Sequence, residues 1–317
     1  MPEEVTVSRY GQELKPQWDK FISDSKNGIF IFFRNYMEYH SDRFIDNSLL
    51  FLKGLNIVGV MPANVKSDAL FSHGGLTFGG IISSYKVETH LMLAIFDKLI
   101  EYCKQTGICK IVYKAIPPIY HKLPAGEDLY ALFRYDAKLS RRDVSSTVQM
   151  DNRLPFTKGR RWSINKGKTA GLVIEQSNNF KDFMRIEEAV LSKKYKVKPT
   201  HTAEEMELLA KRFPENIKLF TAQKENEILA GVIVYESGNV AHTQYISSTD
   251  EGKKLHATDS VLSYLIDNYY ANKRYFDFGI STENEGRFLN EGLIAQKEAF
   301  GARAIVYDTY VLEITHK

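Results

Sequence analysis

The predicted order of secondary-structure elements occurs twice along the chain, and this repeat limits the possible folds more than any other feature. In the first half, three strands, a helix and a fourth strand are predicted at 48–54, 56–65, 76–84, 87–107 and 109–116. In the second half, the same series is predicted at 217–224, 227–235, 240–248, 257–273 and 274–281. Matching residues keep a similar offset between the halves, as for Leu52 and Thr221, Gly59 and Gly231, and Ile116 and Ile280. The repeat indicates a duplicated α/β unit.

The residues between the two repeats predict the domain boundary. The stretch NRLPFTKGRRWSINKGKTAG holds turn residues and basic residues but few apolar ones, which is typical of a connecting segment. We therefore expect two α/β (α+β layered) domains at 1–150 and 171–317, joined by a basic linker at 151–170. In each domain, antiparallel strands accompany helices, which indicates a mixed, mainly antiparallel sheet with helices beside it.

Two local signals predict further elements. Thr202 and Glu205 fit the T-x-x-E capping box, so a helix should begin at Ala203. The run GIFIFF at 28–33 is the densest apolar stretch and predicts a buried strand.

Composition excludes several classes of protein. The 317 residues include 42 basic and 39 acidic ones, a net charge of +3, which does not suit a dedicated nucleic-acid binder. No apolar run approaches the roughly 20 residues of a membrane span. The first ten residues, MPEEVTVSRY, lack the apolar segment of a secretory signal, so we expect a cytoplasmic protein. Cys103 and Cys109 have no His or Cys neighbours in the pattern of a metal site, so no metal is expected.

Residues 289–304 predict a helix that ends at Phe300-Gly301, and this helix carries a lysine close to its predicted buried stripe. Asn290 and Lys297 are seven residues apart and share one face of the helix, with Leu293 between them and Arg287 one turn earlier. Lys297 could place a positive charge where an oxyanion forms, or hold a substrate phosphate. The alternative is a lysine whose stem covers apolar surface while its amine stays in water.

Polar residues on two strands of the second half are further candidates. Asp277 lies in an otherwise apolar strand, so it needs a partner or a chemical role, and it could act as a general base. Tyr245 could donate a proton, and His242 could point into the same space. His73, in SHGGLTFGG, is a candidate in the first half. For the carboxylate and both histidines, a structural role is the alternative.

The chain resembles the GNAT acyltransferases, with two such units in tandem. The resemblance rests on segments from both halves: SHGGLTFGG, EDLYALFRYDAKLSRRDVSS, KGRRWSINKGK, LAGVIVY, YFDFGIST and LNEGLIAQKEAFGARA. Tandem units of this length resemble the Fem-type (FemAB-like) peptidyltransferases and bacterial GNAT proteins often found with surface-polysaccharide genes. In Fem-type enzymes a helix near the C-terminus carries an aromatic residue, a lysine, two more residues and Phe-Gly. Residues 296–301, QKEAFG, fit this frame except for the glutamine, which implies that Lys297 lies near the acyl-transfer centre.

The resemblance also implies a donor site. GNAT enzymes hold the pyrophosphate of coenzyme A with backbone N–H groups at a helix N-terminus, in a Q/R-x-x-G-x-G/A loop. The corresponding loop here supplies six candidate cofactor-binding residues: Ser248, Gly252, Lys253, Lys254, His256 and Ala257. It lacks the full glycine pattern, and Asp250 and Glu251 would repel a pyrophosphate. The loop of the first half, at 83–88, has no glycine, so the first domain is expected to be structural or to serve the acceptor.

The predicted linker suggests an acceptor with phosphate groups. It carries five basic residues and a tryptophan: Lys158, Arg160, Arg161, Lys166, Lys168 and Trp162. Arginine binds phosphate in bidentate fashion, and tryptophan stacks on a base or sugar. A nucleotide-linked or lipid-linked sugar, a cell-wall precursor or a tRNA end would suit such a surface. A solvated charged linker is the alternative.

These features lead to the hypothesis of an acyltransferase that moves an acyl group, most simply acetyl, from acyl-CoA to an amine or hydroxyl acceptor. Lys297, Asp277 and Tyr245 would serve catalysis, while Asn290, Arg287, His242, His73, Arg160 and Arg161 would bind the substrate. One alternative is a Fem-type enzyme that uses aminoacyl-tRNA, which the degenerate loop favours and the near-neutral charge opposes. Another is an inactive GNAT pair that only binds ligands. The acceptor, the acyl group and the oligomeric state stay open.

Overall fold

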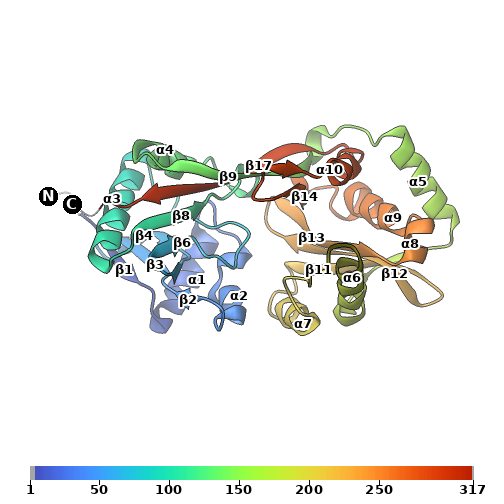
Figure 1. Ribbon diagram of the computed structural model, residues 1–317, viewed down its shortest axis with the longest axis horizontal. Helices are drawn as coiled ribbons and strands as arrows, with labels where there is room; N and C mark the ends of the chain where they lie inside the picture. Colours follow the sequence, from blue (N-terminus) through green and yellow to red (C-terminus); the bar gives the residue numbers. More distant parts are fainter. Residues whose placement is uncertain (1–3, 316–317) are drawn as a thin grey trace. The chain divides into compact units, whose positions relative to one another are not determined.

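The computed structural model describes residues 4–315 and divides into two compact units (Figure 1). The first unit contains the chain up to Asp143, the segment Asn284–Arg287 and the chain from Val306 onward. The second unit contains Val144–Glu283 and Phe288–Ile305. The predicted boundary at 150 therefore differs from the structure, in which the division falls within one strand and the C-terminal strand returns to the first unit. Periodicity along the sequence does not reveal which distant strands a terminal segment pairs with.

The first unit contains two groups of strands together with four α-helices among the described residues. The order of one group is β1, β3, β4 and β7, all antiparallel, with bounds Val5–Arg9, Leu49–Lys53, Asn56–Met61 and Ile82–Ser83. The order of the other is β9, β17, β8, β6, β5 and β2, with bounds Lys138–Gln149, Arg303–Glu313, Lys110–Lys114, Ala69–Phe71, Asn64–Lys66 and Ile45–Asp46. The helices are α1, α2, α3 and α4, with bounds Lys15–Asp24, Arg34–Met37, Thr89–Thr106 and Glu127–Arg134. Leu91, Ile95 and Leu99 of α3 share one hydrophobic core with Leu49 and Phe51 of β3.

The second unit contains a mainly antiparallel sheet with helices on both faces. Its strand order is β10, β11, β12, β13, β14 and the C-terminal half of β9, with bounds for the first five of Val173–Ser177, Ile217–Lys224, Glu227–Glu236, Val240–Ser248 and Tyr275–Ile280. The helices are α5 to α10, with bounds Lys158–Thr169, Phe180–Tyr195, Ala203–Arg212, Asp250–Lys254, Ala257–Tyr264 and Glu291–Glu298. A short hairpin joins β15 (Thr282–Glu283) and β16 (Phe288–Leu289).

Alternate residues of β12 place α6 and α9 on opposite faces of this sheet (Figure 1). Val232 belongs to the hydrophobic core that contains Val261 of α9. Gly231, the neighbour of Val232, faces α6, and a Cβ added there would lie 2.5 Å from the ring of Phe183. Because successive side chains of a strand point to opposite faces, the two helices cover opposite faces. The predicted α/β class, with mixed and mainly antiparallel sheets flanked by helices, is confirmed in both units.

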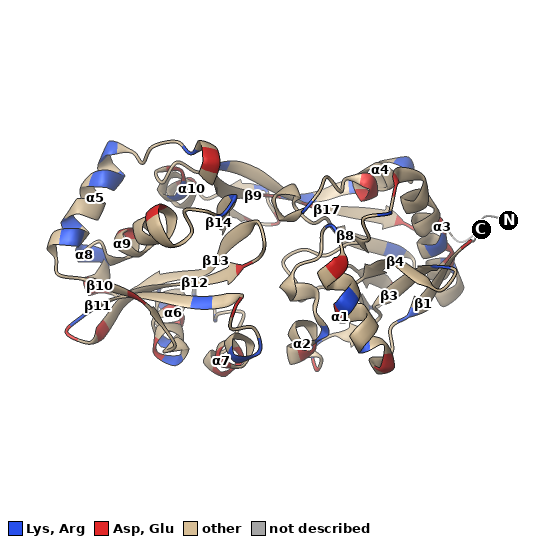
Figure 2. Ribbon diagram, turned by 180° about the vertical axis from the view of Figure 1, so that it is seen from behind, with Lys and Arg blue, Asp and Glu red and all other residues tan. Residues whose placement is uncertain are grey.

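The segment predicted as a basic linker is instead the helix α5. The Thr157 side chain accepts a hydrogen bond from the Arg160 backbone N–H and caps the helix. Ile164 and Gly167 are the buried residues of α5, and a Cβ at Gly167 would lie 2.0 Å from the Ser260 hydroxyl of α9. Close approach to α9 thus requires glycine, and several other residues along α5 are basic (Figure 2). With one large apolar residue on its buried face, the helix had too weak a periodicity to be recognised.

Two predicted strands of the first unit are also wrong or shortened. The run at 28–33 forms a 3₁₀ turn at Phe30–Phe32, with all three side chains buried, so its apolar character reflects burial and not strand geometry. Of the strand predicted at 76–84, only Ile82–Ser83 is extended in a ladder. Gly80, at φ +83°, adopts a left-handed conformation that ends any regular strand before it.

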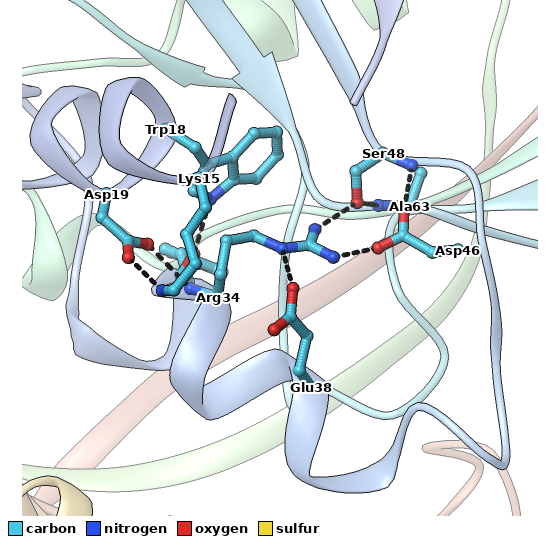
Figure 3. A network of polar contacts seen from close by, with 9 residues as sticks. Lys15, Trp18, Asp19, Arg34, Glu38, Asp46, Ser48 and Ala63 are labelled. Atoms are coloured by element: carbon cyan, nitrogen blue, oxygen red, sulfur yellow. Dashed lines mark hydrogen bonds and ion pairs between the residues drawn. The ribbon is translucent and has the colours of Figure 1, made fainter. Parts of the chain in front are cut away.

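A buried arginine, Arg34 of α2, forms polar contacts that link the N-terminal helices of the first unit to the segment before β3 (Figure 3). The Arg34 side chain donates to Glu38 at 3.0 Å and to Ser48 at 3.1 Å, and it forms an ion pair with Asp46. Its guanidinium carbon also lies 3.7 Å from the centre of the Tyr10 ring. Each of the three guanidinium nitrogens therefore has a partner, as burial of a charge requires.

No helix within residues 4–315 is long and apolar enough to cross a membrane.

Candidate active site

The neighbouring strands β13 and β14 of the second unit run in parallel and then separate. They are paired only from Val240 to His242 on β13 and from Tyr275 to Asp277 on β14. β13 nevertheless continues to Ser248 and β14 to Ile280. The sheet therefore opens between the two strands just beyond His242 and Asp277.

A β-bulge in β13 determines which side chains face each side of this opening. Val234 pairs with Thr243 and Ile233 pairs with Tyr245, so Gln244 has no counterpart on β12. An extra residue shifts the side-chain alternation by one. His242 and Tyr245 consequently lie on the same face of the sheet, which a regular strand would not allow.

A cleft of about 600 Å³ lies at this opening, entirely within the second unit. Its lining comes from α5, α6, β13, α8, α9, β14 and α10. Six of the predicted site residues line it: Lys297, Arg160, Ser248, Gly252, Lys253 and His256. The predicted residues Tyr245, Asp277, His242, Lys254, Ala257, Asn290, Arg287, His73 and Arg161 do not.

Lys297 lies on α10 with its side chain buried, and its amine holds the end of β14. The Nζ atom donates hydrogen bonds to the carbonyl oxygens of Gly279 at 2.8 Å and Ile280 at 2.7 Å. An ammonium group has three N–H donors, so one remains beyond these two bonds. Burial lowers the pKa of Lys297 to about 8, and the negative charge of Asp277 opposes this shift. The amine is thus mostly charged at pH 7 and lies against the cleft.

Asp277 is fully buried and organises the residues around it. Its Oδ1 atom accepts hydrogen bonds from the hydroxyls of Ser145 at 2.7 Å and Thr147 at 2.6 Å, and its Oδ2 atom lies 2.7 Å from His242 Nδ1. Burial alone would raise the pKa of this carboxyl, but the hydrogen bonds from His242, Thr147 and Ser145 bring it below its usual value. Gly279, at φ +74°, leaves room for the ring, since a Cβ there would lie 3.2 Å from His242 Cε1. Asp277 therefore fixes the position of the His242 ring, and its negative charge favours the charged form of Lys297.

The hydroxyl of Tyr245 is directed away from the cleft. It lies 2.7 Å from His201 Nδ1 and accepts a hydrogen bond from the His201 backbone N–H at 3.2 Å. Burial raises the pKa of Tyr245 to about 12. This geometry positions the loop before α7 and does not bring the hydroxyl to a leaving group in the cleft.

Glu187 is a cleft residue that sequence reasoning missed. It lies on α6, where Glu187, Val190, Leu191 and Lys194 form one helical face along the cleft. Burial raises the pKa of Glu187, and the nearby Ser247 hydroxyl acts in the opposite direction. The available signal was its position: Glu187 continues the apolar stripe of Phe180 and Phe183, where a carboxylate is unusual.

The predicted coenzyme loop forms the short helix α8, and its lysines form ion pairs with carboxylates of the same helix. Asp250 accepts from Lys193 and from Lys253, both at 2.9 Å, and Glu251 accepts from Lys254 at 3.2 Å. The contacts with Lys253 and Lys193 lower the pKa of the exposed Asp250 to about 2. Gly252 N–H donates to the Thr249 hydroxyl at 3.0 Å. The loop's donors and cations are therefore largely occupied by neighbours in the chain.

Packing explains the two small residues of this loop. A Cβ at Gly252 would lie 2.1 Å from the Leu229 carbonyl oxygen, so only glycine fits there. Ala257 is fully buried as the first residue of α9. His256 precedes it in a left-handed conformation and meets Trp162 of α5 edge to face, with ring centres 5.4 Å apart.

Arg160 reaches the cleft, whereas Arg161 does not. Arg160 forms an ion pair with Asp259, donates to the Gln296 carbonyl oxygen at 3.2 Å and lies over the ring of Phe300. Arg161 instead lines a separate surface pocket of about 370 Å³.

The other predicted substrate-binding residues have different surroundings. Asn290 caps α10, because its side chain accepts from Leu293 N–H at 3.0 Å, and it donates to Glu283 at 2.8 Å. Arg287 and His73 belong to the first unit. His73 is buried there at φ 62°, and burial together with the neighbouring His40 lowers its pKa to about 3. Residues 4–315 contain no cluster of three His, Cys, Asp or Glu side chains that could hold a metal ion.

Comparisons with known proteins bear on the fold. Residues 159–287 match a family model described as an acetyltransferase (GNAT) domain. The structure resembles that of FemX, with 12% identity, a TM-score of 0.66 and coverage of 98% of this chain and 97% of FemX. It also resembles the C-terminal domain of a putative lysylphosphatidylglycerol synthetase from Agrobacterium fabrum, with 11% identity, a TM-score of 0.62 and coverage of 94% and 92%.

A third similar structure is a tandem GNAT protein from the clavulanic acid biosynthesis pathway, with 11% identity, a TM-score of 0.53 and coverage of 98% and 99%. A search of curated proteins gave no match. The expected resemblance to GNAT acyltransferases is confirmed for residues 159–287, and the fold of the whole chain resembles those of FemX and the tandem GNAT protein.

Proposed function

From the GNAT-superfamily fold of the chain, we propose that the second unit transfers an acyl group from a phosphate-bearing donor, most simply acetyl-CoA, to an amine or hydroxyl acceptor. The observation that carries this proposal is Lys297, a buried cation at the place where β13 and β14 separate. It lines the cleft while two of its three donors are fixed on carbonyl oxygens.

Lys297 would stabilise the oxyanion that forms when the acceptor attacks the acyl carbonyl. Its remaining N–H can be directed at that oxygen, and burial strengthens the interaction because little water competes. The two bonds to β14 fix the amine before the reaction, so little reorganisation is needed. Asp277 would act as a positioning residue, since it is fully buried and keeps Lys297 charged.

The donor phosphates would bind on the α9 side of the cleft. Three cleft residues there have basic side chains: Arg160, Lys253 and His256. The first N–H groups of a helix have no intrahelical acceptor, and Thr258, in the first turn of α9, lines the cleft. Backbone N–H groups and cations together form a suitable surface for phosphate.

A second candidate donor is an aminoacyl-tRNA. The observation that favours it is the self-pairing of α8, in which Lys253 and Lys254 already neutralise Asp250 and Glu251. Such a loop offers a pyrophosphate fewer free groups than the coenzyme loop of the GNAT pattern does. Both donors present the same chemistry at the reacting centre, an activated acyl carbon with a phosphate-bearing leaving group.

Thermal denaturation with acetyl-CoA, coenzyme A or a mixture of charged tRNAs distinguishes the donors. A ligand at 100 times its Kd should stabilise the folded protein by about 2.7 kcal/mol. Lys253→Glu should remove the shift, because Lys253 lines the cleft, whereas Lys254→Glu is the matched control outside it. A shift with acetyl-CoA supports the thioester donor, and a salt-sensitive shift with charged tRNA alone supports the aminoacyl donor. Binding without any transfer would favour the inactive pair.

A further inference from the structure

Trp162 is a large aromatic residue on the surface of the second unit. Its exposed fraction is 57%, although tryptophan is highly buried on average. The packing of α5 on α9 involves other residues, since Ile164 and Gly167 are the buried ones of α5. The Trp162 ring meets His256 edge to face, with ring centres 5.4 Å apart, and the Lys166 amine lies 5.7 Å from its centre. Much of the tryptophan ring is therefore accessible to another planar group.

The surface around Trp162 is cationic (Figure 2). The sequence of α5 contains five basic residues and no acidic one, and Arg160 is the one that forms an ion pair with a carboxylate among residues 4–315. Lys158, Trp162 and Lys166 follow one another at four-residue spacing, so they lie along one face of the helix. An aromatic ring between two cations suits a ligand that combines a planar group with negative charge, as a nucleotide does.

His256 connects this face of α5 to the cleft. Its ring meets Trp162, and the residue also lines the cleft together with Arg160 and Lys253. The donor phosphates are expected at this end of the cleft, on the α9 side. Because base and phosphate are close together within a nucleotide, a donor whose phosphates lie beside His256 can place its base on the Trp162 ring.

An anionic membrane surface is a poorer match for α5. Helices that lie on membranes present a broad apolar face beside their cations. On α5, Trp162 is the one large apolar side chain that is exposed, because Ile164 is buried. The helix thus offers a single ring and not an apolar face.

We propose that Trp162 stacks on the adenine of the donor, with Lys158 and Lys166 beside the ring for the charged groups of the same nucleotide. This inference rests on the proposed function and names the part of the donor that α5 recognises. Coenzyme A and the 3′ end of a tRNA both carry a terminal adenosine, so this nucleotide is the chemistry that the two candidate donors share. No bond forms or breaks at Trp162, which acts through donor affinity.

The two tryptophans of the chain provide a direct assay, because Trp18 is fully buried and only Trp162 is exposed. Fluorescence titrations compare coenzyme A with 4′-phosphopantetheine, and adenosine 5′-phosphate with ribose 5-phosphate. The trinucleotide CCA represents the tRNA end. At least one adenine probe should quench the wild type, and none should quench Trp162→Phe, in which only Trp18 emits. Quenching by coenzyme A supports the thioester donor, and quenching by CCA alone supports the aminoacyl donor.

Calorimetry gives the affinities of the variants. Trp162→Ala should bind the quenching probe about 5- to 150-fold more weakly, as for loss of a base–aromatic stack. Trp162→Phe keeps an aromatic ring and should recover most of the affinity. The matched control is Phe133→Ala, which removes an exposed aromatic side chain from α4 of the first unit and should bind as the wild type does.

Three results would overturn the inference. One is that no adenine probe quenches the wild type. Another is that the probes without adenine bind as tightly as those with it, and the third is that Trp162→Ala binds as tightly as the control does. If vesicles of phosphatidylglycerol and phosphatidylcholine change the Trp162 emission and no adenine probe does, α5 contacts lipid and the assignment to a nucleotide is wrong.

Transfer assays separate this inference from the proposed function. The adenine is remote from the acyl group, so Trp162→Ala should raise the KM for the donor more than it lowers kcat. With acetyl-CoA as the donor, the variant should also lose preference over acetyl-pantetheine, which has no adenosine. Transfer with equal KM values in wild type and Trp162→Ala would refute the inference while the proposed function stands. Adenine binding that depends on Trp162 in a protein that transfers no acyl group would refute the proposed function alone.

Discussion

Replacing Asp277 with asparagine should destabilise the second unit measurably, although the change is nearly isosteric. The carboxylate is fully buried and accepts from three donors, those of Ser145, Thr147 and His242. In the Asp277→Asn variant, Oδ1 can still accept from both hydroxyls. The new Nδ2 faces His242 Nδ1, which can accept only if the imidazole proton moves to Nε2.

The magnitude follows from the loss of charge in these three bonds. Hydrogen bonds to a charged group contribute about 1.5–3 kcal/mol each and neutral ones about 1 kcal/mol, so their weakening costs about 3 kcal/mol in total. Removal of the buried charge returns part of its desolvation penalty. We expect a net loss of about 2 kcal/mol in the free energy of unfolding. For a unit of this size, that corresponds to a decrease in Tm of about 4–8 °C.

Differential scanning calorimetry between pH 3 and pH 8 provides the assay. The hydrogen bonds lower the pKa of Asp277, so its stabilisation is present above the unfolded value of about 3.9 and is lost as the pH falls through the lower folded value. The difference between wild type and Asp277→Asn should therefore shrink below about pH 4. Asp267→Asn, which removes an exposed ion pair with Arg153, is the control and should cost at most about 1 kcal/mol. Equal Tm values for wild type and Asp277→Asn at pH 7 would refute the reasoning.

Three further variants or conditions test other parts of the structure. Gly279→Ala should cost about 1–2 kcal/mol in thermal unfolding, because φ is +74° and the new Cβ would crowd His242; an unchanged Tm would argue against it. Transfer activity should fall as the pH rises through about 8, where Lys297 loses its charge, and this limb should move to lower pH in Asp277→Asn; a pH-independent rate up to pH 10 would contradict the role of the cation. Arg34→Met should destabilise the first unit by about 3 kcal/mol in urea unfolding, since it removes the buried cation that pairs with Glu38 and Asp46; a change below about 0.5 kcal/mol would show that the network contributes little.

The repeat and the local caps were predictable from the sequence because their signals are short-range. α7 begins at Ala203, and the capping box between Thr202 and Glu205 is present. Helical spacing and the resemblance to Fem-type enzymes together pointed to a position of Lys297 beside a cleft, and the structure places its side chain in the cleft lining. In each of these cases, the residues that determine the structure are near one another in the chain.

The features that complete the site depend on residues far apart in the chain. The bulge at Gln244 is visible only in the register between β12 and β13, yet it places Tyr245 against His201 and away from the cleft. Likewise, α5 is stabilised by its close approach to α9 at Gly167, which composition does not reveal. The periodicity of one segment does not predict which distant segments it will contact.

Glu187 shows a different limit. Its place on the apolar stripe of α6 was visible in the sequence, but a carboxylate there could equally have been paired with a lysine or arginine from another element. Only the surrounding side chains show that it faces a cleft without such a partner. The place of this carboxylate in the cleft lining was therefore visible only in the structure.

The central claim is that the second unit is an acyl-transfer site built around Lys297. Single-turnover transfer from the bound donor, measured beside donor affinity in the wild type and in Lys297→Met, tests it most directly. We expect Lys297→Met to fold, to bind the donor within about 3-fold of the wild type and to transfer at least about 100-fold more slowly, as for removal of an oxyanion donor. Transfer at the wild-type rate by folded Lys297→Met, or a wild-type protein that binds a donor and never transfers its acyl group, would contradict the account.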